Sequence, residues 1–172
     1  VITAMSDRGL RVIAGAMREQ ASTPLAHDAL HGLTLVSFFG MQDALRPEVA
    51  GAMEQAMVAG IRVVMITGDH WLTARAVARE AGIWKEDDTI FTGAEIDAMS
   101  DEELVVRLEG ATVFARVTPE HKLRIVNAYK KRKEIVAMTG DGVNDAPSLV
   151  AADLGVAMGK IGTEVAKEAA DI

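Results

Sequence analysis

The chain has 172 residues and a formal net charge of −7, and 49% of its residues are hydrophobic but only 4% aromatic. This length fits one ordinary domain with a piece of another, and the acidic balance argues against nonspecific nucleic-acid binding. Cysteine is absent, which excludes disulfides and thiolate metal sites. No apolar run approaches the ~20 residues of a membrane span, and the chain start has no signal-peptide pattern. Because Val1 is not a natural start and the last residues break off within a helical pattern, we expect an excised piece of a longer protein.

The apolar pattern predicts an alternation of strands and helices. In the first half we expect a strand, a connector, a strand, a helix, a buried strand and a helix, at residues 10–17, 23–32, 33–39, 47–59, 61–66 and 72–82. In the second half we expect a strand and a helix within 89–110, a strand at 112–117, a helix at 118–131, a strand at 134–138, a short helix from Asp145 or Pro147, a strand at 154–158 and a closing helix from Thr163. Repeated units of this length predict an α/β fold with a doubly wound, mostly parallel sheet and helices on both faces.

Local signals mark several helix ends. Ser100 and Glu103 have the spacing of a capping box, and Thr118 followed by Pro is a favourable helix start. The four histidines show no metal-ligand spacing, so we expect them at the surface or in helix caps.

Two of the predicted strands run into the same tripeptide, Thr-Gly-Asp. They are "VVMITGD" (63–69) and "IVAMTGD" (135–141). Ligands of such folds bind beyond the carboxyl ends of the strands. The Thr hydroxyl and N–H can donate to phosphate oxygens, and Gly lets the backbone approach closely. One such turn would ordinarily only cap a helix, but the repetition favours phosphate-binding loops.

The second of these loops continues as "TGDGVNDAP" and carries additional oxygen ligands. Asp141 and Asp145 can point at one small volume, and Asn144 adds an amide. Few carboxylates and only oxygen ligands are typical of Mg²⁺, which usually bridges to a phosphate. Asp145 can also cap the helix begun by Pro147, so Asp141 is the better metal candidate. Lys122 lies in the first turn of a helix, where the helix dipole disfavours a cation; we interpret it as the charge that holds the phosphate.

Four motifs together resemble the phosphorylation domain of a P-type cation-transporting ATPase, within the haloacid dehalogenase-like superfamily. They are "MITGD", "FARVTPEHK", "AMTGDGVNDAPSL" and "GVAMGKIGTEVAKEAADI". The resemblance is to the calcium-pump branch and covers residues 33–172. Residues 1–32 resemble the end of the inserted nucleotide-binding domain and the hinge back from it.

The resemblance implies a role for each matching residue. Thr67 and Gly68 would contact the phosphoryl oxygens, Asp69 would shape their loop, and Lys122 would neutralise the phosphoryl group. The metal ligands would be Asp141 and Asp145, with Asn144 completing the network around Mg²⁺. The family's Asp-Pro-Pro-Arg stretch reads Asp43-Ala44-Leu45-Arg46 here, with the prolines replaced, so Asp43 and Arg46 would lie near the nucleotide and the hinge.

The chain departs from the family because no Asp-Lys-Thr-Gly sequence occurs in it. In the family an Asp of that motif is phosphorylated by ATP and then dephosphorylated, which drives ion transport. We therefore expect a parent pump in a cell membrane, with this part soluble and on the cytoplasmic side and the chain inactive alone. The implied partners are the nucleotide-binding, actuator and membrane domains and the transported cation, with no nucleic acid.

Two alternatives stay open. Asp43 follows an apolar strand and would be the nucleophile of a small phosphatase, although the usual Asp-x-Asp-x-Thr context is missing around it. The chain would otherwise be a non-catalytic module that binds Mg²⁺ and phosphate without turnover. A dinucleotide site is excluded, because "GDGVND" lacks the third Gly of that fingerprint.

The resemblance also places the missing nucleophile strand between residues 63–66 and 135–138. Unpaired backbone groups on both neighbours would be costly if buried. We therefore expect these strands to pair directly or to accept a substitute, with 33–39 as the best donor. That strand would come from the same chain or, by swapping, from a second copy in a homodimer.

Overall fold

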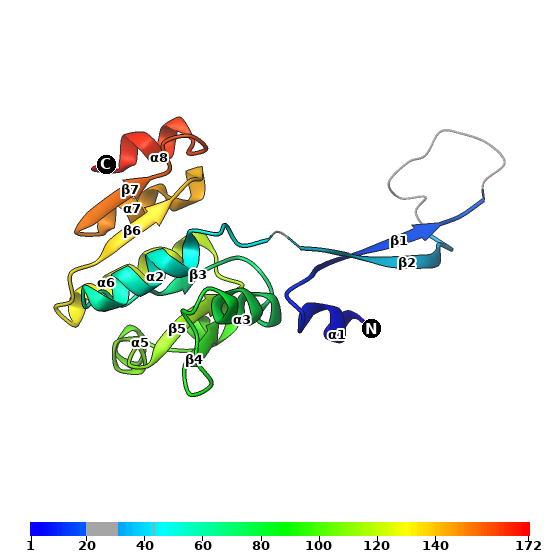
Figure 1. Ribbon diagram of the computed structural model, residues 1–172, viewed down its shortest axis with the longest axis horizontal. Helices are drawn as coiled ribbons and strands as arrows, with labels where there is room; N and C mark the ends of the chain where they lie inside the picture. Colours follow the sequence, from blue (N-terminus) through cyan, green and yellow to red (C-terminus); the bar gives the residue numbers. More distant parts are fainter. Residues whose placement is uncertain (20–30, 43) are drawn as a thin grey trace.

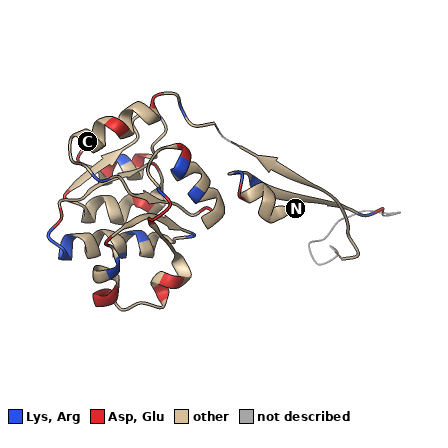
Figure 2. Ribbon diagram, turned by 60° about the horizontal axis from the view of Figure 1, so that its bottom comes forward, with Lys and Arg blue, Asp and Glu red and all other residues tan. Residues whose placement is uncertain are grey.

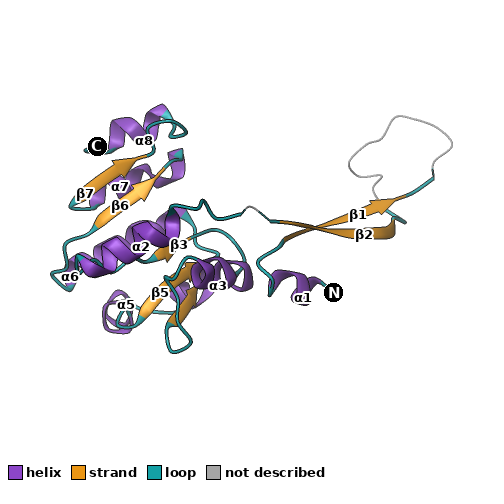
Figure 3. Cartoon of the chain, in the orientation of Figure 1, coloured by secondary structure: helices purple, strands orange, loops and turns teal. Residues whose placement is uncertain are grey.

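The computed structural model describes residues 1–19, 31–42 and 44–172 (Figure 1). Helices and strands alternate through most of this length, as Figure 3 shows. The elements are α1 (Ile2–Ser6), β1 (Arg11–Met17), β2 (Thr34–Met41), α2 (Val49–Val58), β3 (Met65–Ile66), α3 (Trp71–Glu80), β4 (Thr89–Thr92), α4 (Gly93–Asp97), α5 (Asp101–Arg107), β5 (Ala111–Ala115), α6 (Pro119–Lys131), β6 (Ala137–Gly140), the 3₁₀ turn η2 (Val143–Asp145), α7 (Ala146–Ala151), β7 (Leu154–Ala157) and α8 (Glu164–Ala169).

The strands of the body pair in parallel, which confirms the predicted α/β class. One sheet has the order β3-β5-β4, and a second consists of β6 and β7. All five residues of β5 are buried, and Phe114 contributes to a core with Ile96, Leu104 and Ile125 from the helices. A smaller core joins β6 to α6, α7 and α8. The carboxyl ends of β3 and β6 thus carry the two Thr-Gly-Asp segments.

Strands β1 and β2 form a separate antiparallel hairpin that extends away from the body (Figure 1). Figure 2 shows that charged residues are spread over the body, whereas these two strands carry few of them. Several of the hairpin's large apolar side chains are exposed, including Ile13, Leu35 and Phe39. The base of the hairpin is tied to the body, because Asp7 accepts a hydrogen bond from Arg75 of α3 at 3.0 Å.

The expectation that residues 33–39 fill the place of the missing strand is wrong. Their partner is β1, so their antiparallel neighbour is present in this chain. No strand ladder within the described residues joins β3 to β6. The hydrogen bonds of Val136 go instead to Asp153, just before β7. Its carbonyl accepts the Asp153 N–H, and its own N–H donates to the Asp153 carboxylate. Pairing with β1 closes a shorter loop than insertion into the body, and the remaining edge of β6 exposes Ala137 and Thr139 to water. With β2 engaged in its own chain, the reason for a strand-swapped dimer disappears.

The predicted strand at 61–66 is shorter than expected. Only Met65 and Ile66 pair, and both pair with β5 alone. Because β3 has a neighbour on one side only, a single row of hydrogen bonds fixes how far the strand extends. The pairing with β5 therefore ends after two residues.

The predicted helix starts agree closely with the structure. Ser100 and Glu103 form the capping box of α5, and Thr118 and Thr163 cap α6 and α8. His70 caps α3 through its ring, as expected for a histidine without metal-ligand spacing. The short helix begins at Ala146 after the turn η2. Most of the predicted connector at 23–32 lies outside the described residues.

Thr112 on β5 offers a test of core packing. Its hydroxyl is buried without a hydrogen-bond partner among the described residues. Leaving such a group unpaired costs about 1–3 kcal/mol, and valine has the same branched shape and suits a strand. We expect Thr112→Val to raise the free energy of unfolding by about 1 kcal/mol in urea denaturation. Thr112→Ala, which also deletes a methyl group, should gain less. A loss of stability in the valine variant would mean that the hydroxyl has a partner after all.

Candidate phosphate and metal site

A cavity of about 240 Å³ opens between the end of β3 and the end of β6. It is lined by Ile66, Lys122, Met138, Thr139, Gly140, Asp141, Asp145 and Met158. Its position, beyond the carboxyl ends of parallel strands, is where α/β folds bind ligands. The structure thus brings together three of the residues singled out from the sequence, namely Lys122, Asp141 and Asp145.

Lys122 and Asp145 form an ion pair at the wall of this cavity. The Lys122 Nζ donates to Asp145 Oδ1 at 2.5 Å. The other carboxylate oxygen, Oδ2, accepts the N–H groups of Gly142 (3.2 Å) and Asp141 (3.3 Å). Burial by itself raises the pKa of the Asp145 carboxyl, but the hydrogen bonds from Lys122 and Gly142 outweigh it, so this pKa lies below its ordinary value. Asp145 is therefore ionised at neutral pH and committed to contacts within the protein.

Gly140 allows this arrangement. A Cβ atom added at Gly140 would lie 2.5 Å from the Cβ of Asp145, which no side chain can tolerate. The glycine of the second Thr-Gly-Asp segment therefore lets the Asp145 side chain pack against the end of β6.

Asp141 differs from Asp145 in being available to a ligand. Its side chain is exposed, and it accepts no hydrogen bond from the described residues. No group of three or more histidine or acidic side chains within the described ranges is arranged to hold a metal ion. Mg²⁺ needs only one or two protein carboxylates when a phosphate completes its shell. The donor set therefore fits Mg²⁺ through Asp141, whereas the Asp145 oxygens are taken up by Lys122 and backbone N–H groups.

The first Thr-Gly-Asp segment forms its own small network next to the cavity. The Thr67 hydroxyl donates to Asp69 Oδ2 (3.2 Å) and accepts the Asp69 N–H (3.1 Å). The Thr67 N–H donates to the Phe114 carbonyl at 2.9 Å, so it is not free for a phosphate. The exposed Gly68 has space around it. No hydrogen bond within the described part joins this segment to Lys122 or Asp141, and only its neighbour Ile66 lines the cavity.

The remaining predicted site residues are not brought to the cavity wall. Asn144 is exposed in the turn η2. Arg46 is exposed before α2, where its carbonyl accepts the Val49 N–H. Asp43 lies outside the described residues. Thr139, to which the repeated tripeptide pointed, lines the cavity, whereas sequence reasoning did not single out Met138 or Met158.

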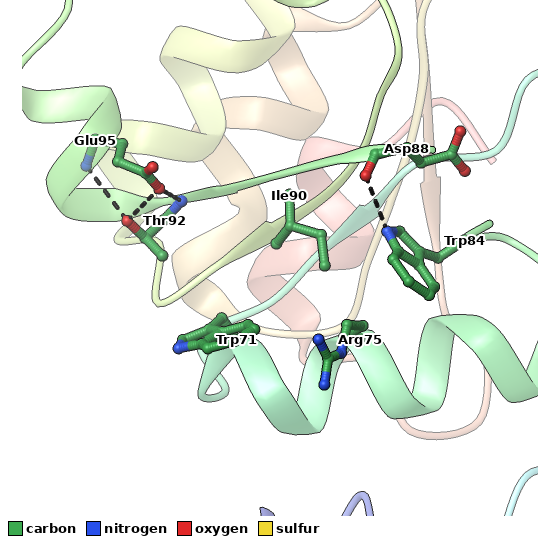
Figure 4. A pocket seen from close by; sticks show the side chains of 7 residues that line it. All are labelled: Trp71, Arg75, Trp84, Asp88, Ile90, Thr92 and Glu95. Atoms are coloured by element: carbon green, nitrogen blue, oxygen red, sulfur yellow. Dashed lines mark hydrogen bonds between the residues drawn. The ribbon is translucent and has the colours of Figure 1, made fainter. Parts of the chain in front are cut away.

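A second cavity, of about 550 Å³, lies between α3 and β4 (Figure 4). It is lined by Trp71, Arg75, Trp84, Asp88, Ile90, Thr92 and Glu95. The Arg75 guanidinium lies 5.2 Å from the centre of the Trp71 ring and 6.0 Å from that of Trp84. This cation also pairs with Asp7, which directly follows α1, so the two rings flank a guanidinium that is already engaged within the protein.

Comparison with known proteins decides the family. A model of the haloacid dehalogenase-like hydrolases matches residues 7–153. The chain belongs to this hydrolase family. Its sequence is 47% identical to the "Calcium-transporting ATPase 1" of Saccharomyces cerevisiae over 98% of the chain and 18% of that protein. It is 50% identical to a calcium-transporting ATPase of Listeria monocytogenes over 96% of the chain and 19% of that protein.

A third relative of this hydrolase-family chain is the "Probable cation-transporting ATPase F" of Mycobacterium bovis, 47% identical over 98% of the chain and 19% of that protein. The resemblance to cation-transporting ATPases, expected from four motifs, is thus confirmed over nearly the whole sequence. The chain spans less than a fifth of the length of these three relatives. No helix in the described ranges is both long enough and apolar enough to cross a membrane.

Proposed function

We propose that the chain is the phosphorylation-domain part of an ATP-driven cation pump similar to the calcium-transporting ATPases. The observation that supports this most directly is the pairing of Lys122 with Asp145 beside the free carboxylate of Asp141, around one cavity. A cation to neutralise phosphoryl oxygens and a carboxylate to hold Mg²⁺ are the groups that phosphoryl transfer needs.

Each side chain has a role in this proposal. An ammonium has three N–H donors; Asp145 takes one from Lys122, so two remain for phosphoryl oxygens. The Thr67 hydroxyl turns from Asp69 toward the phosphoryl group, and the Gly68 N–H donates to it. Asn144 helps to shape the loop around Asp145. Mg²⁺, when bound, neutralises charge on the phosphoryl group, and Asp141 holds it.

The rest of the parent protein supplies what this chain lacks. Residues 33–172 form the phosphorylation unit, and residues 1–32 are the end of a nucleotide-binding domain with its hinge, near which Asp43 and Arg46 bind the nucleotide. The β1–β2 hairpin joins the two parts, because β1 lies before residue 33 and β2 after it. Its exposed apolar side chains suit a cover supplied by another part of the parent protein. The nucleophilic Asp, the actuator and the membrane domains lie elsewhere in a membrane pump that moves a cation, with this part on the cytoplasmic side.

The test is a titration of Mg²⁺ into the chain in the presence of inorganic phosphate. We expect Asp141→Asn to weaken Mg²⁺ binding by at least about tenfold, because among the described residues that line the cavity Asp141 carries the carboxylate left free for a metal. Glu102→Gln, which removes an exposed charge from α5, should leave the affinity unchanged. Equal affinity in the wild-type and Asp141→Asn proteins would remove Asp141 from the metal site.

The same protein incubated with labelled ATP and Mg²⁺ should form no acid-stable phosphoprotein, since the expected nucleophile is absent from the sequence. Labelling that disappears in Asp43→Asn would contradict the proposal and favour a small phosphatase.

A further inference from the structure

The first turn of α6, which presents Lys122 to the cavity, is held by the neighbouring side chain His121. The Nδ1 atom of His121 accepts the Thr118 N–H at 3.1 Å, and the His121 N–H donates to the Thr118 hydroxyl at 3.3 Å. On the other side of the ring, Nε2 lies 2.7 Å from Oδ1 of Asp97, at the end of α4. Because Nδ1 accepts a hydrogen bond, a neutral ring carries its proton on Nε2 and donates it to Asp97.

The ring of His121 packs closely against the start of α4. His121 is buried, and Gly93 at the start of α4 lies directly against it. A Cβ atom added at Gly93 would lie 3.0 Å from the ring and 2.3 Å from the Arg116 carbonyl oxygen. The first turn of α6 and the start of α4 are therefore packed closely together through this ring.

The turn that precedes α6 also holds the first Thr-Gly-Asp segment. The Arg116 N–H donates to the Asp69 carbonyl at 2.9 Å, and the Val117 N–H donates to the Thr67 carbonyl at 3.2 Å. Arg116 has a left-handed backbone, with φ of 52°, which is uncommon for a residue with a side chain. The contacts of His121 thus fix a turn that two parts of the proposed site share.

We propose that His121 is a positioning residue that, through Asp97, sets the first turn of α6 so that the Lys122 ammonium reaches the phosphoryl position. His121 does not line the cavity and acts only through Lys122. The identity of the bound group rests on the proposed function, whereas the positioning rests on the contacts of the ring. A long, flexible lysine loses much of its freedom when it is held at one place, so a fixed starting point for its stem favours the pair with Asp145.

Arg124 provides a matched control, because it ties α6 to the same part of the chain without touching the cap. Its guanidinium donates to Asp101 Oδ1 (2.7 Å) and to the carbonyls of Ile96 (2.7 Å) and Met99 (2.5 Å). If any loss of docking between α6 and α4–α5 released Lys122, a change at Arg124 would release it too.

The experiment measures reductive methylation of Lys122 by mass spectrometry, relative to the exposed Lys160. In the 172-residue protein we expect His121→Ala and Asp97→Ala to raise the methylation rate of Lys122 about tenfold, because the hydrogen bond from Lys122 to Asp145 is released. Arg124→Met should lower stability but leave the rate within about twofold. Asp97→Asn keeps the Oδ1 acceptor and should keep the wild-type rate.

Two results would overturn the positioning role. One is a wild-type methylation rate of Lys122 in both alanine variants, and the other is an equally raised rate in Arg124→Met. Because Asp97 is largely exposed, we expect its variants to fold even if His121→Ala does not.

Binding of inorganic phosphate in the presence of Mg²⁺ distinguishes this inference from the proposed function. We expect the phosphate affinity to fall in His121→Ala and Asp97→Ala, the variants in which the methylation rate of Lys122 rises. In Arg124→Met the phosphate affinity should stay at the wild-type value. A wild-type protein that binds no phosphate would overturn the proposed function, while the methylation of Lys122 would still decide the positioning role.

Discussion

Replacing Gly93 by alanine should lower the free energy of unfolding by about 3 kcal/mol, which is the upper part of the range for overpacking. The added Cβ would lie 2.3 Å from the Arg116 carbonyl oxygen, and a backbone atom cannot move aside as the end of a flexible side chain can. Arg116 is itself fixed by the bond from its N–H to the Asp69 carbonyl. Thermal unfolding should show a fall in Tm of about 6–12 °C for a chain of this size.

Gly51 gives the matched control with the opposite sign. It lies within α2, it is exposed, and a Cβ added there would meet nothing within 4 Å. Gly51→Ala should therefore raise stability by about 0.5–1 kcal/mol, because alanine is the better helix former. A loss of less than about 0.5 kcal/mol in Gly93→Ala, within the range of ordinary surface changes, would mean that α4 does not pack against the turn at Arg116 as closely as the structure has it.

Features that depend on neighbouring residues were predictable from the sequence. Thr118 caps α6, and Ser100 with Glu103 caps α5, because each cap joins a side chain to a backbone group three residues away. The strand–helix alternation followed from local apolar patterns, and with it the parallel pairing of β3, β4 and β5.

Features that depend on distant pairing were predicted less well. The apolar pattern of 33–39 indicated a strand but carried no information on its partner, and the chain pairs it with β1 rather than inserting it beside β6. The pattern of 61–66 likewise indicated a buried strand, but only two residues find a neighbour. Strand pairing is decided by competing long-range contacts, which a single strand's pattern does not record.

The candidate site shows the same division. The second Thr-Gly-Asp segment and the cation at Lys122 were singled out because their residue types are unusual at these positions, and the structure places both around one cavity. The first Thr-Gly-Asp segment does not line that cavity. The pairing of Lys122 with Asp145 spans 23 residues of sequence, and His121 with Asp97 spans 24. Neither pair has a sequence signature, so the commitment of Asp145 to an ion pair emerged only from the structure.

Replacing Lys122 by methionine should lower the free energy of unfolding at neutral pH by about 2–3 kcal/mol. Methionine keeps much of the apolar stem but leaves the Asp145 carboxylate, whose side chain is only 9% exposed, without its cation. The N–H groups of Asp141 and Gly142 remain, so the loss should stay below that of a fully unpaired buried charge. Urea denaturation measures this loss, and Lys122→Met combined with Asp145→Asn should recover part of it, because no buried charge is then left unpaired.

The pH dependence identifies the ion pair as the cause. The folded protein lowers the pKa of Asp145, so the stability contributed by this carboxylate is complete above its unfolded pKa of about 3.9 and is lost as the pH falls through the lower folded value. In Lys122→Met the cation that helps to lower this pKa is gone, while burial and the two backbone N–H groups remain. The pKa of Asp145 is therefore higher in the variant than in the wild type, and acid protonates and relieves the variant first. The difference in unfolding free energy between the two proteins should therefore be largest near pH 7 and should shrink steadily below about pH 4. A difference that stays constant from neutral pH into acid would show that the lost packing of the lysine stem, and not the charge pair with Asp145, accounts for the effect.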